Sequence, residues 1–370
     1  MKVGILGAGQ LGRMLALAGI PMNVEFVLSD PVKDACGNKL GEFINGSFDD
    51  ESVLQALVDK VDVVTVESEN ISVKSLQWLN ERVPVYPSPV AVATAQDRLL
   101  EKQMFAKLGI PVTNYQAIEQ AQAFMDYCSS NTQPMIAKSR REGYDGKGQV
   151  RINAGTDLKA AWEALAGVPV VVEDMVNFDR EISIIAARDK HGETVFYPIC
   201  ENTHADGILR CTKARLNDPM QSLAQDYIKR VMDELDYVGV LTFEFFNCGD
   251  ELIANEIAPR VHNSGHWSIE GVDSSQFENH IRAICGFPLG STETRGPVAM
   301  INVIGEMPPR DAVLSVDGAH WHDYGKQPRS GRKLGHITLR ANNQQQFDER
   351  LAKLENLFAD KLTPFGECKH

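Results

Sequence analysis

Apolar and polar positions alternate in blocks along residues 1–95. Short apolar runs at 2–6, 25–29 and 61–66 are separated by stretches with helical spacing, the first of which begins at Gln10. Alternation of this kind is typical of a parallel sheet with crossover helices. The block is therefore predicted to be an N-terminal α/β domain.

Residues 90–175 no longer show the regular alternation of strands and helices. A helical pattern over 90–108 is predicted to end at Gly109. Residues 112–175 then mix short apolar strands with a helix and a glycine-rich loop at 143–148. This α+β pattern with a glycine-rich loop indicates a lid.

Two strands around a tight turn are predicted between 240 and 260, and each carries one carboxylate in an otherwise apolar run. If the hairpin is symmetric about Asp250, Glu244 and Glu256 face each other, which destabilises a sheet when both are charged. A hard cation, Mg²⁺ or alternatively Mn²⁺, would remove that penalty. A solvent-facing edge pair is the alternative from the hairpin alone. The polar run at 259–267 favours the metal.

A first glycine-rich turn, formed by Gly7, Gly9 and Gly12, follows the first strand and opens a helix. Asp30 ends the second strand, where dinucleotide-binding folds place a ribose-binding acid. Alone, this pattern predicts a nicotinamide-dependent oxidoreductase. Glycines that only shape the turn, or a helix N-terminus that binds a monophosphate, are the alternatives.

The second glycine-rich loop, 143–149, lies between strands and contains Lys147. We expect a flap over a nucleoside triphosphate, with a plain hairpin turn as the alternative. Lys138 is predicted to bind phosphate, because an ammonium in an apolar strand is costly unless it meets an anion. Glu173 and Glu181 flank a segment suited to adenine and ribose, although solvated loop acids are equally consistent.

Length and composition limit the other possibilities. A chain of 370 residues is expected to form two or three domains. The formal charge of −13 argues against binding to nucleic acid or an anionic membrane, while small anionic ligands are still allowed. Seven scattered cysteines without a CxxC pair favour reduced thiols and a cytoplasmic location, and neither a signal peptide nor a membrane span is recognised.

Six segments carry a wider resemblance, namely 9–15, 140–149, 177–183, 201–204, 255–267 and 332–338. Together they resemble the ATP-grasp superfamily and, within it, the 5-(carboxyamino)imidazole ribonucleotide synthase family of purine biosynthesis. The resemblance covers nearly the whole chain. It implies an ATP-grasp fold of the α/β and α+β classes, with a Rossmann-like parallel-sheet domain at 1–95, an ATP-grasp domain at 96–295 with its lid at about 112–175, and a small C-terminal domain at 296–370. A homodimer is expected on the same basis.

The resemblance also implies an ATP site between lid and body. Its expected residues are Arg98, Lys138, Gly143, Tyr144, Asp145, Gly146, Lys147, Gly148, Gln149, Glu173, Asp174, Met175, Val176, Glu181, His204, Asn255 and Glu256. Glu244 and Glu256 would hold Mg²⁺. Because Ala258 stands where related ligases often have asparagine, two protein carboxylates are expected to be the metal ligands.

The second substrate implied is 5-aminoimidazole ribonucleotide. Residues expected to bind it are Gln10, Leu11, Glu67, Arg260, Asn263, Ser264, Lys333 and Arg340. The resemblance assigns its 5′-phosphate to Lys333 and Arg340, with the Gln10–Leu11 turn nearby. The first glycine-rich loop would then bind the ribonucleotide and not a nicotinamide cofactor.

The reaction implied joins bicarbonate to this ribonucleotide. Bicarbonate attacks the γ-phosphorus of ATP to give carboxyphosphate and ADP, and the carboxyl then passes to the exocyclic amine, which gives N5-carboxyaminoimidazole ribonucleotide and phosphate. Positioning and charge neutralisation are expected to dominate catalysis. The residues expected to act are Tyr144, Asp145, Lys147, Arg260 and His262, with His262 hypothesised as the general base.

Three alternatives stay open at this point. A formate-dependent glycinamide ribonucleotide transformylase of the same superfamily shares most of the layout. A nicotinamide-dependent oxidoreductase would use the first glycine-rich loop. An ATP-binding protein without ligase activity is the third, although an inactive binder should have lost a charged residue of the site.

Overall fold

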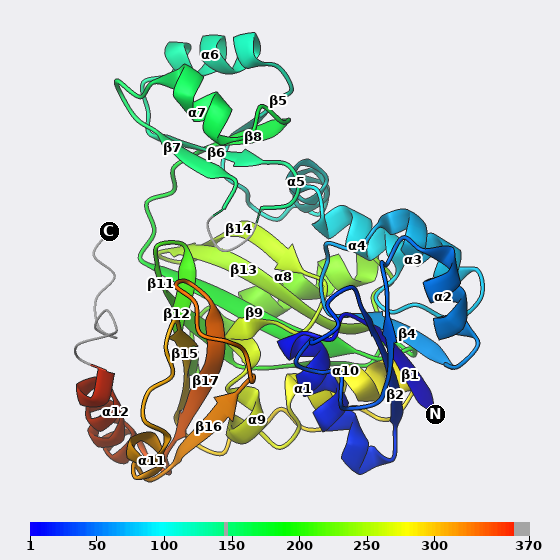
Figure 1. The fold of residues 1–370 in the computed structure, drawn as a ribbon. Coiled ribbons are helices and arrows are strands. Elements are labelled where there is room, and N and C mark those ends of the chain that lie inside the picture. The colour runs from blue at the N-terminus through cyan, green and yellow to red at the C-terminus, as the bar shows by residue number, and fades with distance from the viewer. Residues whose placement is uncertain (144–146, 359–370) are drawn as a thin grey trace.

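The computed structural model describes residues 1–143 and 147–358 and contains three sheets (Figure 1). The first is parallel and four-stranded, in the order β3-β2-β1-β4, and it confirms the predicted N-terminal α/β domain. Its elements are β1 (Lys2–Leu6), α1 (Gln10–Gly19), η1 (Ile20–Met22), β2 (Glu25–Asp30), β3 (Glu42–Asn45), α2 (Glu51–Val58), β4 (Val63–Val66) and α3 (Val73–Asn80).

The single helix expected over 90–108 is wrong, because two helices occupy this segment. They are α4 (Pro89–Ala95) and α5 (Arg98–Lys107). Asp97 separates them, and its Oδ1 accepts the backbone N–H of Leu99 at 3.0 Å, which caps α5. The same carboxylate receives Arg140 at 2.7 Å, and this ion pair ties the start of α5 to the lid.

The second sheet is antiparallel, in the order β5-β8-β6-β7, and forms the lobe at the top of Figure 1. Phe124 and Trp162 pack against one another between its helices and the sheet. The elements are β5 (Tyr115–Ile118), α6 (Ala121–Ser130), β6 (Met135–Ser139), β7 (Gln149–Ile152), α7 (Leu158–Ala164) and β8 (Val170–Asp174). We call this lobe the lid.

The third sheet is central, and its main path runs β14-β13-β9-β11-β12-β15-β17-β16, with β10 paired to β9. The strands after residue 296 continue this sheet, because β15 pairs with β12. The elements are β9 (Arg180–Arg188), β10 (Thr194–Phe196), β11 (Ile199–Ala205), β12 (Ile208–Arg215), α8 (Gln221–Glu234), β13 (Gly239–Cys248), β14 (Glu251–Ala258), η2 (Asn263–Gly265), α9 (Ser268–Gly271), α10 (Gln276–Cys285), β15 (Val298–Ile304), α11 (Arg310–Leu314), β16 (Ala319–Asp323), β17 (Lys333–Arg340) and α12 (Gln344–Phe358).

Helices cover both faces of the central sheet. Ile228 of α8 shares a buried cluster with Phe243 of β13, on one face. On the other face, Ile281 of α10 packs in one cluster with Leu15 of α1, which joins the N-terminal domain to the body. This packing brings the glycine-rich turn before α1 close to the end of the central sheet.

The β13–β14 hairpin has the predicted carboxylate pair but a different centre. Cys248 pairs with Glu251 across a two-residue turn, whereas Glu244 pairs with Glu256. The register shifts by one residue between these pairs, which leaves Asn255 as the extra residue of a bulge. Because of this bulge, Glu244 faces Glu256, as the prediction of a hairpin symmetric about Asp250 requires.

Two general expectations concern the described residues. Every cysteine described there is a free thiol, as the scattered spacing predicts. Within residues 1–143 and 147–358, no helix combines the length and the apolar character needed to cross a membrane.

Candidate functional site

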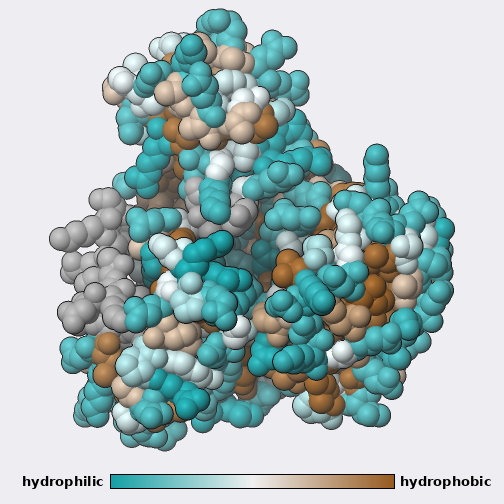
Figure 2. Space-filling view, viewed as in Figure 1, coloured by the Kyte–Doolittle hydropathy of each residue, from teal (hydrophilic) through white to brown (hydrophobic). Residues whose placement is uncertain are grey.

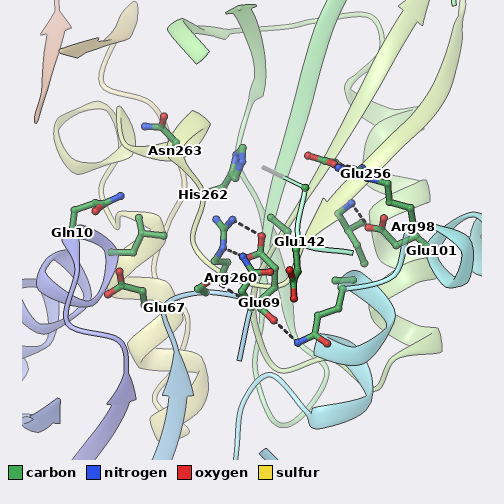
Figure 3. Close-up of a pocket in the computed structure, with 18 of the residues that line it drawn as sticks. Gln10, Glu67, Glu69, Arg98, Glu101, Glu142, Glu256, Arg260, His262 and Asn263 are labelled. Atoms are coloured by element: carbon green, nitrogen blue, oxygen red, sulfur yellow. Dashed lines mark hydrogen bonds and ion pairs between the residues drawn. The ribbon is translucent and has the colours of Figure 1, made fainter. Parts of the chain in front are cut away.

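A polar cleft of about 370 Å³ lies where the three sheets meet, a size typical of small-molecule sites. Figure 2 shows the hydrophilic recess between the lid and the two lobes below it. In Figure 3, Gln10 and Glu67 lie on one side of the cleft, Arg98 and Glu256 on the other, and Arg260 with Glu69 between them. The expected residues that line it are Gln10, Leu11, Glu67, Arg98, Gly143, Glu256, Arg260, His262, Asn263 and Lys333.

The two facing carboxylates of the hairpin differ in charge state. Burial and the charge of Glu256 raise the pKa of Glu244 above its ordinary value. Burial also acts to raise the pKa of Glu256, but the guanidinium of Arg98, 2.6 Å away, outweighs it and lowers that pKa. A proton or a cation is therefore favoured at Glu244.

Lys138 lies in a buried charge cluster that reaches the bulge of β14. Its Nζ is 3.1 Å from Glu173 Oε2 and 3.4 Å from Asn255 Oδ1. Lys102 of α5, a residue that the sequence reasoning missed, lies 3.2 Å from the same Glu173 oxygen. Burial acts to raise the pKa of Glu173, but the two lysines outweigh it and lower that pKa. Glu173 thus holds two cations in place, so its carboxylate is engaged within the protein.

Glu101, on α5, was also missed. Its side chain lines the cleft and accepts the backbone N–H of Ile257 at 2.9 Å. Burial and the charge of Glu256 raise the pKa of Glu101 to about 8. The only sequence signal for Glu101 and Lys102 is their position within two turns of the charged Asp97–Arg98 pair.

The segment after Glu173 is anchored through its backbone. The N–H of Asp174 donates to the carbonyl of Asn114 at 3.0 Å, and that of Met175 donates to Pro134 at 3.0 Å. Val176 follows directly and lies between β8 and β9. This connection links the lid to the body.

Glu181 and His204 lie together on neighbouring strands, β9 and β11. Their nearest atoms, Glu181 Oε2 and His204 Nδ1, are 3.0 Å apart. Burial acts to lower the pKa of His204, but the carboxylate of Glu181 outweighs it and raises that pKa. The pair therefore binds one proton readily.

Arg260 is held by Glu69, which was not foreseen. Its Nη2 lies 3.0 Å from Glu69 Oε1, and its Nε contacts the second oxygen of the same carboxylate (Figure 3). A paired, two-point contact fixes the plane of the guanidinium. Glu69 stands two residues after Glu67 in a segment that enters the cleft, and this spacing was the available signal.

His262 lies between Glu244 and the start of η2. Its Nε2 is 3.5 Å from Glu244 Oε1, and its Nδ1 is 2.8 Å from Ser264 Oγ. Burial lowers the pKa of His262 well below its ordinary value, and the positive charge of Arg260 lowers it further. Ser264 is fully buried and contacts His262, so its side chain supports the site from behind.

The first glycine-rich turn encloses a carboxylate. A Cβ on Gly9 would lie 2.0 Å from Glu67 Oε1, and one on Gly12 would lie 2.7 Å from Oε2, where the Gly12 N–H donates at 2.9 Å. Burial raises the pKa of Glu67 to about 7. Asp30 accepts the N–H of Ala8 at 2.8 Å. The carboxylate of Glu67 occupies the space beside the turn that a dinucleotide's pyrophosphate would need, which argues against the oxidoreductase alternative.

The opposite side of this part of the cleft comes from the C-terminal strands. Lys326, which was missed, donates to Gln10 Oε1 at 2.5 Å, and Lys333 begins β17. Asn263 exchanges hydrogen bonds of 3.0 and 2.6 Å with Asn302 of β15. These contacts join the N-terminal and C-terminal segments around one pocket.

The predicted contact of Arg340 with the ribonucleotide phosphate does not agree with its position in the fold. It ends β17 seven residues after Lys333, so the two residues are about 23 Å apart at ~3.3 Å per residue. Their side chains cannot both reach one phosphate over that distance. The guanidinium of Arg340 instead donates to the backbone carbonyl of Glu270 at 3.4 Å, outside the cleft.

The loop expected to close over ATP is described in part. Gly143 lies near Arg98, Gly148 adopts a positive φ of 69° beside Ser139, and Gln149 begins β7 opposite Lys138. Lys147 is exposed. Tyr144, Asp145 and Gly146 lie outside the described residues.

Three family models match the chain in sequence order. The Ribonucleotide synthetase preATP-grasp domain matches residues 1–96, the ATP-grasp domain matches 103–277, and the Phosphoribosylaminoimidazole carboxylase C-terminal domain matches 298–350.

Individual relatives cover nearly all of the chain. The N5-carboxyaminoimidazole ribonucleotide synthase of Pseudomonas aeruginosa is 48% identical over 96% of this chain and 99% of its own. The crystal structure of N5-carboxyaminoimidazole ribonucleotide synthetase from Thermus thermophilus has a TM-score of 0.92 and 45% identity, with 98% of this chain and all of that chain covered. The N5-carboxyaminoimidazole synthase of Aspergillus clavatus, in complex with ADP and 5-aminoimidazole ribonucleotide, has a TM-score of 0.88 and 30% identity over 97% and 98% of the chains.

Proposed function

The chain belongs to the N5-carboxyaminoimidazole ribonucleotide synthase family of ATP-grasp ligases, and we propose that its cleft carboxylates 5-aminoimidazole ribonucleotide at the expense of ATP and bicarbonate. The products are N5-carboxyaminoimidazole ribonucleotide, ADP and phosphate. This step belongs to purine biosynthesis.

One observation carries the proposal. A single cleft connects Arg98 and Glu256, beneath the lid, with Gln10 and Lys333, at the junction of the N-terminal and C-terminal segments. Two anionic substrates can thus meet without leaving the protein. Transfer of an activated carboxyl group requires such a shared space, because carboxyphosphate reacts with water when it is released.

ATP is proposed to bind between the lid and the central sheet. Lys138 and Arg98 both reach the bulge of β14, where they can bind the phosphates. The Glu173–Val176 connection is the proposed adenine contact through its backbone, and Glu181 with His204 is the proposed ribose contact. Lys147 and the glycines beside it would cover the phosphates.

Mg²⁺ fits the residues at the hairpin. Glu244 and Glu256 face each other, and burial together with the charge of Glu256 raises the pKa of Glu244, an effect that a bound cation would offset. In the described ranges, no group of three or more histidine, cysteine, aspartate or glutamate side chains is arranged to hold a metal. Two carboxylates with phosphate oxygens would therefore hold the ion, whose charge would stabilise the transferring phosphoryl group.

The ribonucleotide is proposed to bind at the other end of the cleft. Lys333 is the proposed phosphate ligand, with the Gln10–Leu11 turn beside it. Glu67 and Asn263 would contact the sugar and the base. Arg260, with its plane fixed by Glu69, is proposed to bind the carboxyl group of carboxyphosphate and to present it to the amine.

Substrate dependence tests the proposal. Purified protein with Mg²⁺ is expected to release phosphate from ATP only when both 5-aminoimidazole ribonucleotide and bicarbonate are present. Equal phosphate release with formate and glycinamide ribonucleotide would instead assign the chain to the transformylase. Omission of each substrate in turn is the matched control.

Two further predictions concern assembly and location, the first from the resemblance and the second from the scattered cysteines. A homodimer is expected, and sedimentation of the purified protein would measure it. A cytoplasmic location is expected as well, and it agrees with the reduced state of the described cysteines.

A further inference from the structure

A chain of hydrogen bonds leads from His262 into the interior of the central sheet. His262 Nδ1 lies 2.8 Å from Ser264 Oγ, which lies 2.9 Å from Ser183 Oγ. Asn202 Nδ2 donates to Ser183 Oγ at 3.0 Å, and Thr212 Oγ1 donates to Asn202 Oδ1 at 2.9 Å. The four residues behind His262 are at most 3% exposed, so the protein alone satisfies these polar groups.

The sheet register builds this chain. Ser183 of β9 is directly opposite Glu244 of β13, and Asn202 of β11 is directly opposite Thr212 of β12. Because side chains opposite each other share a face, the chain and Glu244 lie on the face that meets η2. Ser264, in η2, completes the connection to His262.

One fixed donor sets the direction of the whole chain. The backbone N–H of Ser264 donates to His262 Nδ1 at 3.3 Å, in the manner of a helix N-cap. A backbone N–H can only donate, so Nδ1 must present its lone pair. The Ser264 hydroxyl must then also donate to Nδ1 and accept from Ser183. Ser183 accepts in turn from the amide of Asn202, and Thr212 holds that amide in place.

The consequence concerns the other ring nitrogen. When Nδ1 is an acceptor, the imidazole has its hydrogen on Nε2. Nε2 points toward Glu244 Oε1 at 3.5 Å, and His262 lines the cleft. The cleft therefore meets an N–H at this position, whereas a general base needs a lone pair.

We infer that His262 serves the reaction as a hydrogen-bond donor through Nε2 and not as the general base, that Ser264 fixes this tautomer, and that Ser183 and Asn202 are positioning residues that hold the Ser264 hydroxyl. The identity of the group that accepts this hydrogen bond is inferred from the proposed function. It is a carboxyl or phosphoryl oxygen of carboxyphosphate, whose negative charge an oriented N–H stabilises. The tautomer is inferred from the hydrogen bonds of the protein and does not depend on the proposed function.

The first test needs no substrate. Nitrogen-15 NMR of the full chain labelled at its nine histidines reports which ring nitrogen bears hydrogen, and the His262 signal is the one lost in His262→Ala. We expect hydrogen on Nε2. Hydrogen on Nδ1, or on both nitrogens, would overturn the inference. Since the free protein is measured, this outcome is independent of whether the proposed reaction occurs.

The second test compares substitutes for His262. A glutamine amide can place an N–H near the position of Nε2, so His262→Gln is expected to keep kcat within about tenfold of wild type, the worth of one hydrogen bond. His262→Ala is expected to lose about 10²-fold or more. Equal losses in both variants would indicate a base and would contradict the donor role.

The positioning residues are tested with a matched pair of buried threonines. Thr212→Val removes the last donor of the chain and releases the Asn202 amide, and we expect a lower kcat and an unchanged KM for ATP, while the Ser264 N–H keeps the hydrogen of His262 on Nε2. Thr338→Val is the control, because Thr338 is equally buried on β17 and its hydroxyl has no hydrogen-bond partner among the residues that the structure describes. Identical behaviour of the two variants would refute the positioning role. Ser183→Ala repeats the test nearer to His262.

Discussion

The guanidinium of Arg98 lies 2.6 Å from the carboxylate of Glu256, and among the described residues this is the guanidinium contact of the two facing carboxylates of the β13–β14 hairpin. The other, Glu244, has a raised pKa because it is buried beside that negative charge. This imbalance is the physical basis for a cation site at the hairpin.

Glu256→Gln is expected to lower Mg²⁺-dependent turnover by about 10²-fold or more, because a metal supplies several kcal/mol of charge stabilisation to the transition state. Turnover measured as a function of Mg²⁺ concentration, with circular dichroism to verify the fold, makes the test. Glu251→Gln, at the exposed start of β14, is the matched control and should leave turnover unchanged. Normal turnover in Glu256→Gln would refute the metal assignment.

Lys333→Ala is expected to raise the KM for 5-aminoimidazole ribonucleotide by about 10- to 100-fold, the worth of a hydrogen bond to a charged group. The KM for ATP should not change. Arg340→Ala is the control, since that residue ends the same strand outside the cleft. A selective effect of Lys333→Ala on ATP would disprove the phosphate assignment, and so would an equal effect of both variants on the ribonucleotide.

Glu101 gives a prediction about stability and pH. Its pKa rises from 4.5 to about 8 on folding, so the folded protein binds the proton more tightly than the unfolded chain. The stabilisation is complete below pH 4.5 and is lost as the pH rises toward 8, by at most about 1.4 kcal/mol per pH unit. Glu101→Gln should therefore unfold with a shallower dependence on pH over this window. Parallel curves of unfolding midpoint against pH for the two proteins would show that Glu101 is ionised in the fold.

The elements that the sequence predicted well are those set by local pattern. The parallel N-terminal sheet follows from the alternation of apolar runs with helical stretches, and the pairing of Glu244 with Glu256 follows from two apolar strands around a short turn. The predicted centre of the hairpin was one half-residue off, and the bulge at Asn255 compensated for it at the carboxylates.

The residues that were missed depend on tertiary packing. Lys102 and Glu69 look like ordinary polar residues in their own segments. Their roles become visible only in the fold, where Lys102 contacts Glu173 of β8 and Glu69 contacts Arg260. The glycine-rich turn was ambiguous for the same reason, because its neighbour Glu67 arrives from another strand. The break at Asp97 is different, because its carboxylate caps α5 locally through the N–H of Leu99.

The most direct measurement of the central claim follows oxygen from bicarbonate into phosphate. If bicarbonate attacks the γ-phosphorus and the amine then attacks the carboxyl carbon, the bridging oxygen stays with phosphorus. With ¹⁸O-labelled bicarbonate, ATP, Mg²⁺ and 5-aminoimidazole ribonucleotide, mass spectrometry is expected to find one ¹⁸O atom in each phosphate released. Unlabelled phosphate formed at the same rate would contradict carboxyphosphate and, with it, the proposed reaction of this cleft.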